Sequence, residues 1–418
     1  MSLAHEPSLA AIAASPQAFG KLPALAGAPA TFRFAARLLA LNWRVGTLTF
    51  ITPSGRELRL KGTDPGPEGR IIIHDFGFMR RVMAAGDIGF AEGYMAGEWD
   101  TPDLSAVLGV LSLNFDRLAK IFRGNPLVRA VNFVGHALNA NTKKGSRKNI
   151  HAHYDLGNTF YGEWLDRTMT YSSARYERPG QALEAAQTNK YRTLAEGMGL
   201  SRDHSVLEIG CGWGGFAEFA AKEVGAKVTG ITISQEQFDF ARKRIFEQGL
   251  SERAEIRMVD YRDVEGRFDR VASIEMFEAV GERYWPAYFG KIRDVLVDGG
   301  RAGLQIITIR DDIFAAYRRR ADFIQKYIFP GGMLPSEARL KTETTRAGLD
   351  WTGISRFGQD YADTLAEWGK RFESAWGEIA ALGFDERFRK LWRFYLSYCE
   401  AGFRTERTNV VQLSLAKA

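Results

Sequence analysis

A glycine-rich turn is the first feature of the chain with a chemical meaning. It reads Glu208-Ile-Gly210-Cys-Gly212-Trp-Gly214-Gly215 and follows the apolar run Ser205–Ile209, which is typical of a short buried strand. Glycines let the backbone approach a ligand closely where a strand passes into a helix. Open α/β sheets bind ligands at the carboxyl ends of their strands. The turn therefore predicts a small-molecule site at one edge of a sheet.

The segments after the next two strands narrow the choice of ligand. A dinucleotide site needs a different glycine spacing and an acidic residue after the second strand. That strand ends instead in Gly230-Ile-Thr232-Ile-Ser234-Gln235, which carries no carboxylate. The third strand is followed by Asp260-Tyr261-Arg262-Asp263, where an acidic residue suits an adenine amino group. The pattern argues against NAD and is compatible with another ligand that contains adenine.

Composition limits the class of protein. The 418 residues predict two or three domains, and 45% hydrophobic with 25% charged residues is ordinary for a soluble globular chain. No apolar run reaches about 18 residues, so no transmembrane helix is expected. Two cysteines, and six histidines of which none follows His204, predict no metal site and favour the cytoplasm. The net charge of +6 is compatible with an anionic partner or with solvated surface lysines and arginines.

Alternating helices and strands predict the architecture that must position the turn. From about residue 188 onward, helical segments alternate with short apolar strands, which implies a mostly parallel sheet with helices on both faces. The expected strands are Ser205–Ile209, Ala226–Ile231, Glu255–Val259, Arg270–Ile274, Ala302–Thr308 and a terminal Asn409–Leu415. The expected helices include Asn189–Met198, Gly215–Val224 and Ser234–Gln248, and the stretches Asp311–Gly332 and Leu365–Gly402 are helix-rich and aromatic.

The N-terminal part has a different pattern, which predicts a separate small domain. Strands are expected at Gly46–Thr52, Glu57–Leu60 and Arg70–His74, with a turn at Thr63–Pro67 and helices beginning near Phe78 and Leu104. We predict a flexible segment over 1–28, an N-terminal domain over 29–139, a basic linker over 140–152, and a catalytic domain over 153–418.

The glycine-rich turn, Gly230–Gln237 and Asp260–Asp263 resemble the cofactor motifs of class I S-adenosylmethionine (SAM) methyltransferases. Further segments resemble the cyclopropane-fatty-acyl-phospholipid synthase family over residues 145–415. These are His153-Tyr-Asp-Leu-Gly-Asn158, Thr170-Tyr-Ser-Ser173, Met276-Phe-Glu278-Ala-Val-Gly281, Lys326-Tyr-Ile-Phe-Pro-Gly331 and Phe357-Gly-Gln-Asp-Tyr361. The resemblance implies an α/β, Rossmann-like class I methyltransferase with a mostly parallel seven-stranded sheet, plus a smaller N-terminal α+β domain that engages lipid.

The same resemblance implies which residues bind SAM. The expected cofactor-binding residues are Tyr171, Ser172, Glu208, Gly210, Gly212, Gly214, Thr232, Ser234, Gln237, Asp260, Tyr261 and Arg262. Aromatic side chains could stabilise a carbocation on the substrate and exclude water. The candidates for that lining are Phe323, Tyr327, Phe329, Trp368, Trp376, Trp392, Phe394 and Tyr398.

The implied reaction is methyl transfer to a carbon–carbon double bond, followed by loss of a proton. Family members that close a cyclopropane ring use bicarbonate as the base, held by cysteine, glutamate, histidine and tyrosine. Glu278 and Tyr361 match this set, whereas Ser173 stands at the cysteine position and Ile307 at the histidine position. Glu278, Tyr361 and Ser173 are the expected catalytic residues. Either Glu278 is itself the base, with a pKa raised by apolar surroundings, or Ser173, Tyr361 and backbone donors retain bicarbonate.

The departures at Ser173 and Ile307 leave the product open between a cyclopropane and a methyl-branched unsaturated or furan-precursor chain. The expected substrate is an unsaturated phospholipid at an anionic membrane surface, reached by a cytoplasmic, peripherally bound protein. The family resemblance implies a homodimer. Three other classes compete with this expectation: a nucleic-acid methyltransferase, a non-catalytic lipid-binding protein, and an enzyme acting on a soluble small molecule. Nucleic acid is not an expected partner, because Ser273–Glu278 lacks the Asn/Asp-Pro-Pro-aromatic motif of base-methylating enzymes.

Overall fold

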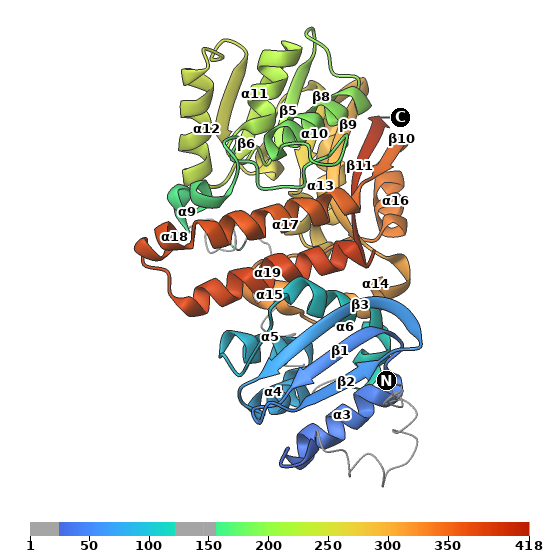
Figure 1. The fold of residues 1–418 in the computed structure, drawn as a ribbon. Helices are drawn as coiled ribbons and strands as arrows, with labels where there is room; N and C mark the ends of the chain where they lie inside the picture. The colour runs from blue at the N-terminus through green and yellow to red at the C-terminus, as the bar shows by residue number, and fades with distance from the viewer. Residues whose placement is uncertain (1–24, 122–144, 146–155, 418) are drawn as a thin grey trace. The chain divides into compact units, whose positions relative to one another are not determined.

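The computed structural model describes residues 25–121, 145 and 156–417 of the chain (Figure 1). The described residues form two compact units. The first unit holds residues 25–121 together with Phe384–Thr405. The second unit holds residues 145, 156–383 and 406–417. The predicted N-terminal segment and basic linker lie almost wholly outside the described residues. The segment Phe384–Thr405, placed in the catalytic domain by the sequence, belongs here to the first unit.

The first unit is built on a four-stranded sheet in the order β2-β1-β3-β4. Strand β1 pairs antiparallel with β2 and parallel with β3, and β3 pairs antiparallel with β4. Helix α6 packs against β1 and β3, and α19 packs against α5 and α6. The elements are α3 (Ala30–Asn42), β1 (Val45–Ile51), β2 (Glu57–Lys61), β3 (Asp64–Ile73), α4 (Gly77–Ala85), α5 (Asp87–Met95), β4 (Trp99–Asp100), α6 (Leu104–Ile121) and α19 (Glu386–Arg404).

The turn expected at Thr63–Pro67 is wrong, because β3 begins at Asp64. The register of β3 against β1 shifts between the pairs Val45–Asp64 and Thr47–Glu68. This irregularity spans Pro65 and Pro67. A proline has no N–H to donate to a strand ladder, and such residues are tolerated where a bulge interrupts the pairing. The prolines therefore mark an irregular strand and not its boundary.

The second unit is an α/β fold around a seven-stranded sheet in the order β10-β11-β9-β8-β5-β6-β7. The pairs among β5, β6, β7, β8 and β9 are all parallel, whereas β11 runs antiparallel to both β9 and β10. The strands are β5 (Ser205–Ile209), β6 (Lys227–Thr232), β7 (Ala254–Met258), β8 (Phe268–Ile274), β9 (Leu296–Ile309), β10 (Leu349–Arg356) and β11 (Thr408–Lys417). The mostly parallel seven-stranded sheet is confirmed.

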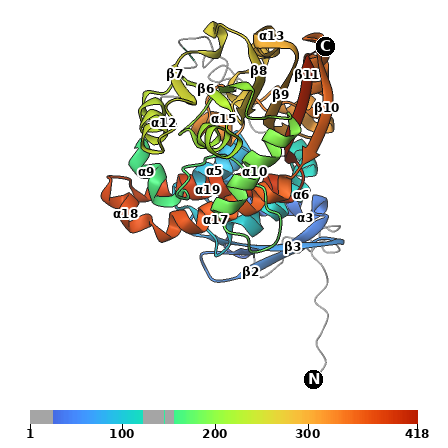
Figure 2. The same cartoon turned by 90° about the horizontal axis from the view of Figure 1, so that it is seen from above.

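Helices cover both faces of this sheet (Figure 2). Alternate residues of β5 show why: Val206 packs into one apolar cluster with α10, α11 and α12, and Leu207 into another with α13 and α16. The helices are α9 (Gly157–Trp164), α10 (Leu183–Gly197), α11 (Gly215–Phe219), α12 (Gln235–Glu247), α13 (Trp285–Val295), α14 (Asp311–Tyr317), α15 (Phe323–Tyr327), α16 (Glu337–Arg346), α17 (Gly358–Ser374) and α18 (Trp376–Ala381).

Three details of this unit differ from the sequence expectation. The helix expected at Gly215–Val224 is α11 followed by a π-helical turn over Ala220–Val224. Strand β9 begins at Leu296, earlier than expected, and β10 has no counterpart among the strands located from the sequence. Strand β10 alternates weakly between apolar and polar residues, so its pairing with β11 defines it better than its own pattern does. Within the described residues, no helix combines the length and apolarity that crossing a bilayer requires.

Candidate active site

The glycine-rich turn leaves β5 at the carboxyl edge of the sheet and leads into α11. Gly210, Gly212 and Gly214 have φ angles of 80°, 52° and 83°, a region that favours glycine. A Cβ atom at Gly210 would lie 2.7 Å from the Cγ of Met276, so a side chain there is excluded. A Cβ atom at Gly212 would have no neighbour within 4 Å. The turn is thus tightly packed against Met276 and open at Gly212, as a ligand cradle needs.

Glu208 lies just before the turn and is 2% exposed. Among the described residues, its Oε2 has no hydrogen-bond partner. Burial raises the pKa of Glu208, while Lys190, the backbone N–H of Ala217 and Arg244 oppose that shift. A buried acceptor without a donor is unfavourable unless a ligand supplies one. The ammonium group of SAM would do so, and the residues around the turn therefore fit the cofactor that the sequence predicts.

The ends of β6 and β7 carry the other predicted cofactor residues. The Thr232 hydroxyl donates to Gln237 Oε1 at 2.9 Å, and Ser234 accepts from the backbone N–H of Gln237 as the N-cap of α12. At the end of β7, Arg262 donates to both oxygens of Asp260, at 2.8 and 2.7 Å. Asp260 was expected to accept from adenine, but its carboxylate is already engaged by this guanidinium.

Tyr261 and Tyr171 are held by aromatic packing. The Tyr261 ring centroid lies 5.5 Å from that of Tyr288, and burial raises the pKa of Tyr261 to about 12. The Tyr171 ring lies 5.3 Å from those of both Tyr161 and Trp368. The Tyr261 phenol is therefore neutral at physiological pH, and both rings present apolar surface beside the predicted cofactor site.

The segment after Tyr171 points its polar atoms into the protein. Ser172 Oγ accepts from Lys190 Nζ at 2.7 Å. Ser173 is fully buried, and its hydroxyl donates to the carbonyl oxygen of Ala174 at 2.8 Å. The backbone N–H of Ser173 donates to Glu275 Oε1 at 2.9 Å. Ser173 was expected to hold an anion through its hydroxyl; in the structure its backbone N–H contacts a carboxylate.

That carboxylate belongs to Glu275, which directly follows β8. It accepts hydrogen bonds from Tyr361 Oη at 2.7 Å, from Gln305 Nε2 at 2.7 Å and from the Ser173 N–H. The residue is partly buried, and its φ of 50° is rare for a residue other than glycine. Burial raises the pKa of Glu275, while its three donors and Lys190 oppose that shift. The sequence analysis did not select this residue.

Buried amides fix the orientation of the Glu275 donors. Gln305 Oε1 accepts from Gln412 Nε2 at 3.2 Å, which leaves the Gln305 amide nitrogen facing Glu275. Gln412 Oε1 in turn accepts from Arg175 and Thr193. Strand pairing sets this chain of contacts, because Gln305 is opposite Gln412 on β11 and beside Ile274 on β8. Such networks are rigid when every member is satisfied.

Glu278, the predicted base, occupies a different position. One of its oxygens accepts from the backbone N–H of Ile307. The other is enclosed and has no hydrogen-bond partner among the described residues. Burial, with a smaller contribution from the charge of Glu275, raises the pKa of Glu278 to about 8. Near neutral pH, Glu278 therefore holds a proton, and the carboxylate with more hydrogen-bond donors is that of Glu275.

Lys190 supplies a buried amino group to this region. It is fully buried on α10, and burial lowers its pKa to about 7, although Glu275, Asp166 and Glu208 oppose that shift, so the group is partly charged near neutral pH. The sequence analysis missed Lys190, Glu275, Gln305 and Gln412. A usable signal existed for the two glutamines, since each interrupts an otherwise apolar strand. A polar side chain inside such a strand must find a partner or leave a buried group unsatisfied.

The structure divides the predicted aromatic lining between the units. Trp368 on α17 packs near Tyr171 and Tyr361, at 5.3 and 6.2 Å between ring centroids. Phe323 and Tyr327 pack together on α15, and Trp376 packs on Phe372. Trp392, Phe394 and Tyr398 lie on α19 in the first unit, where Phe394 contacts the rings of Phe90 and Tyr94.

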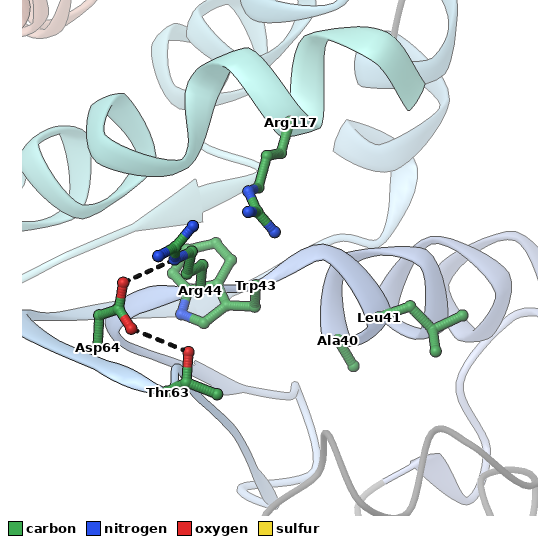
Figure 3. A pocket seen from close by; sticks show the side chains of 7 residues that line it. All are labelled: Ala40, Leu41, Trp43, Arg44, Thr63, Asp64 and Arg117. Carbon is green, nitrogen blue, oxygen red and sulfur yellow. Dashed lines mark hydrogen bonds and ion pairs between the residues drawn. The ribbon is translucent and has the colours of Figure 1, made fainter.

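A cavity of about 390 Å³ lies in the first unit and involves none of the predicted site residues (Figure 3). Arg44 and Arg117 present guanidinium groups to it, and Arg44 pairs with Asp64 at 2.7 Å. The remaining lining residues are Ala40, Leu41, Trp43 and Thr63. The arrangement is cationic and exposed, without a nucleophile or a buried acid, so chemistry is assigned to the second unit.

Comparison with known proteins agrees with this geometry. The family model described as mycolic acid cyclopropane synthetase matches residues 141–413. A tuberculostearic acid methyltransferase of Mycobacterium tuberculosis is 39% identical over 85% of this chain and 84% of its own. The cyclopropane-fatty-acyl-phospholipid synthase of Escherichia coli is 34% identical over 81% of this chain and 86% of its own.

A solved structure extends the comparison to the cofactor. The mycolic acid cyclopropane synthase CmaA1, determined in complex with SAH and CTAB, aligns with a TM-score of 0.61 at 28% identity. The alignment covers 65% of this chain and 98% of that one. The turn at Gly210–Gly214, the sheet order and these similarities lead to one assignment. The chain belongs to the mycolic acid cyclopropane synthetase family and is a SAM-dependent methyltransferase.

Proposed function

We propose that this enzyme transfers the SAM methyl group to the double bond of an unsaturated fatty acyl chain in a membrane phospholipid. The observation that carries the proposal is an ordered, partly buried carboxylate cluster beside the glycine-rich turn, next to aromatic rings. A proton acceptor near a methyl donor is what C-methylation of an alkene requires. The name of the Escherichia coli relative supports an acyl phospholipid as the substrate.

The proposed cofactor site lies along the carboxyl ends of β5, β6 and β7. Gly210, Gly212 and Gly214 shape the cradle, Glu208 meets the ammonium group, and Tyr171 and Ser172 close one side. Thr232, Ser234, Gln237, Asp260, Tyr261 and Arg262 form the remainder. SAM supplies an activated methyl group there. Holding that methyl close to the alkene and in line with it accounts for much of the rate enhancement, because an alkene is a weak nucleophile.

The reaction begins when the π electrons of the alkene form a bond to the methyl carbon. The carbon–sulfur bond breaks, and its electron pair stays on sulfur. The cation left on the acyl chain is stabilised by the faces of Tyr171 and Trp368, which also exclude water. Loss of one proton then gives a neutral product. Its electron pair closes a ring when the proton leaves the new methyl group.

Ring closure to a cyclopropane is the first product that we propose. The alternative, a methyl-branched unsaturated or furan-precursor chain, arises when a different proton is lost. Two observations support this alternative product: Ile307 offers no side-chain donor, and the Ser173 hydroxyl donates to the carbonyl oxygen of Ala174. Either feature alters how a base is held at the expected anion site, and hence which proton it can reach.

SAM with a trideuterated methyl group tests the function and separates the products. The purified protein is incubated with this donor and vesicles of defined unsaturated phospholipids, and the fatty acids are analysed by mass spectrometry. A ring retains two deuterium atoms, and a methyl branch retains all three. Turnover to labelled lipid supports the function. Labelled SAM consumed on RNA or on a soluble acceptor, with none on lipid, contradicts it.

We also infer that the protein acts from the cytoplasm on an anionic membrane surface, to which it binds peripherally. The net charge of +6 and the guanidinium groups of Arg44 and Arg117, which line one cavity of the first unit, support this. Binding to vesicles should rise with anionic lipid content and weaken with salt. Equal binding to neutral vesicles contradicts the electrostatic contribution. A homodimer stays a prediction from the family resemblance, and sedimentation analysis tests it.

A further inference from the structure

We propose that Glu275 is the proton acceptor of this reaction, so that the chain itself supplies the carboxylate and needs no bound bicarbonate. The inference rests on the proposed methyl transfer and specifies its base. The proton lost by the substrate cation is transferred to a Glu275 carboxylate oxygen. The electron pair of the broken C–H bond forms the new C–C or C=C bond, and the proton later passes to solvent.

The donors around Glu275 are the first argument. Tyr361 and the Ser173 N–H both donate to its carboxylate, at 2.7 and 2.9 Å. These are two of the groups that the sequence analysis assigned to holding an anion. In the structure, they hold an anion that belongs to the protein. The third donor, Gln305, lies at 2.7 Å and is fully buried.

The position of Glu275 is the second argument. It is adjacent in sequence to Met276, whose side chain packs against Gly210 of the cofactor turn. Its donor Tyr361 lies near Trp368, which in turn lies near Tyr171. Glu275 thus lies between the predicted methyl donor and the aromatic wall. As a residue, Glu275 is less buried than Glu208, which is 2% exposed.

The backbone is the third argument. Of the described residues other than glycine, only Met169, Glu275 and Glu406 have a positive φ. A left-handed conformation costs an ordinary residue about 1–2 kcal/mol, and glycine would avoid that cost. Retaining a glutamate at φ 50° indicates a role for its side chain that offsets the strain. The side chain of Glu275 has such a role in the structure, because its carboxylate accepts three hydrogen bonds.

Charge balance explains why Glu275 and not Glu278 takes the proton. The Glu278 carboxyl is enclosed, has one backbone donor and holds a proton near neutral pH. Glu275 has three donors and the favourable charge of Lys190, so its anionic form is the better stabilised of the two. A base must be free of a proton before it accepts one.

Two substitutions test the proposal. Glu275→Gln keeps the size of the side chain and removes its basicity, so kcat should fall about 100-fold or more while the calorimetric Kd for SAM is unchanged. Glu275→Gly places a glycine at the positive φ and removes the carboxylate, which leaves the three hydrogen-bond donors without an acceptor. Added bicarbonate or formate should then raise its kcat by at least tenfold, with no such effect on Glu275→Gln. The unaltered protein should be equally active in bicarbonate-free and bicarbonate-containing buffer.

Two controls isolate the carboxylate. Glu406→Gly relieves a φ of 56° at an exposed residue of the same unit and should leave kcat unchanged. Glu255→Gln removes an exposed acid and should do the same. The pH profile adds a readout that a structural role would not affect: the fall in kcat on the acid side should disappear in Glu275→Gln.

The outcomes distinguish a failure of this inference from a failure of the proposed methyl transfer to lipid. If the unaltered protein forms no S-adenosylhomocysteine with any unsaturated lipid, the proposed function fails and the inference fails with it. If it does, and Glu275→Gln keeps its kcat within threefold, the inference alone is overturned. A requirement of the unaltered protein for bicarbonate overturns it as well.

Discussion

Two carboxylates at the same edge of the sheet are held in opposite ways. Asp260, after β7, accepts hydrogen bonds from the guanidinium of Arg262. The side chains of Asp260 and Arg262 are only 4% and 17% exposed, respectively. Glu275, after β8, is held by a phenol, an amide and a backbone N–H, all of them neutral. The Asp260 carboxylate raises the pKa of Arg262, and the pair behaves as one neutral unit.

The difference shows how one fold assigns binding and chemistry to neighbouring loops. A carboxylate held by a permanent cation contributes shape and hydrogen-bond geometry, as a cofactor pocket requires. A carboxylate held by neutral donors in a poorly solvated site keeps an affinity for protons. We therefore expect changes near Asp260 to affect SAM binding, and changes near Glu275 to affect turnover or stability. Four substitutions test that separation.

Lys190→Met should have the largest effect, because it removes the buried cation shared by Glu275, Glu208 and Asp166. Removing one partner of a buried charge pair typically costs about 3–5 kcal/mol of unfolding free energy. For a unit of this size, we expect a Tm lower by roughly 10 °C. Calorimetry measures it, with the exposed Lys227→Met as control. An unchanged Tm would show that the region does not depend on this charge.

Glu278→Gln should change the pH dependence of stability. The pKa of Glu278 is raised from a usual 4.5 to about 8. Between these values the unfolded chain releases the proton and the folded chain keeps it, so stability falls as pH rises through this window. The variant lacks that loss. The unfolding free energy of the variant relative to that of the unaltered protein should increase by a few kcal/mol from pH 5 to pH 8 and should level off above pH 8. The difference between the two Tm values should follow the same course.

A matched surface acid controls this experiment. Glu337→Gln removes a carboxylate that pairs with Arg356 and lies outside the site. Its Tm difference should not vary over the same pH range. If the Glu278→Gln difference is also constant, Glu278 is ionised in the folded protein and the division of charge between the two glutamates is wrong.

Tyr361→Phe should separate turnover from binding. The change removes one donor to the Glu275 carboxylate and preserves the ring that packs near Trp368. A hydrogen bond to a charged group contributes about 1.5–3 kcal/mol, so kcat should fall between tenfold and a hundredfold. The Kd for SAM should stay constant in calorimetry. A weaker Kd with normal kcat would place Tyr361 in the cofactor site.

Asp260→Asn should give the converse result with the smallest effect. The amide oxygen can still accept from the Arg262 backbone, but the charge that balances the guanidinium is lost. We expect the Kd for SAM to weaken about tenfold, equivalent to about 1.4 kcal/mol, with kcat at saturating SAM unchanged. A lower kcat at saturation would mean that the two loops are not separate in function.

The role of Asp260 could be predicted from the sequence, whereas that of Glu275 could not. Asp260 follows an apolar strand at a position that local pattern alone marks, and its partner Arg262 is two residues away. The partners of Glu275 are 86 and 102 residues away at Tyr361 and Ser173. Local pattern therefore found the first, whereas the family resemblance selected Glu278 and not the second. Contacts at such separations depend on strand order, which periodicity does not encode.

Most helices and strands other than β10, the glycine-rich turn and the family were determined by the sequence alone, because each depends on residues close together in the chain. The tertiary structure decided that three distant segments, which carry Ser173, Gln305 and Tyr361, converge on Glu275. For Gln305 the reason is strand order, because β9 lies between β8 and β11 and so brings Gln305 beside Ile274 and opposite Gln412. Burial and neutral donors, not residue type, then decide which of several acids can accept a proton.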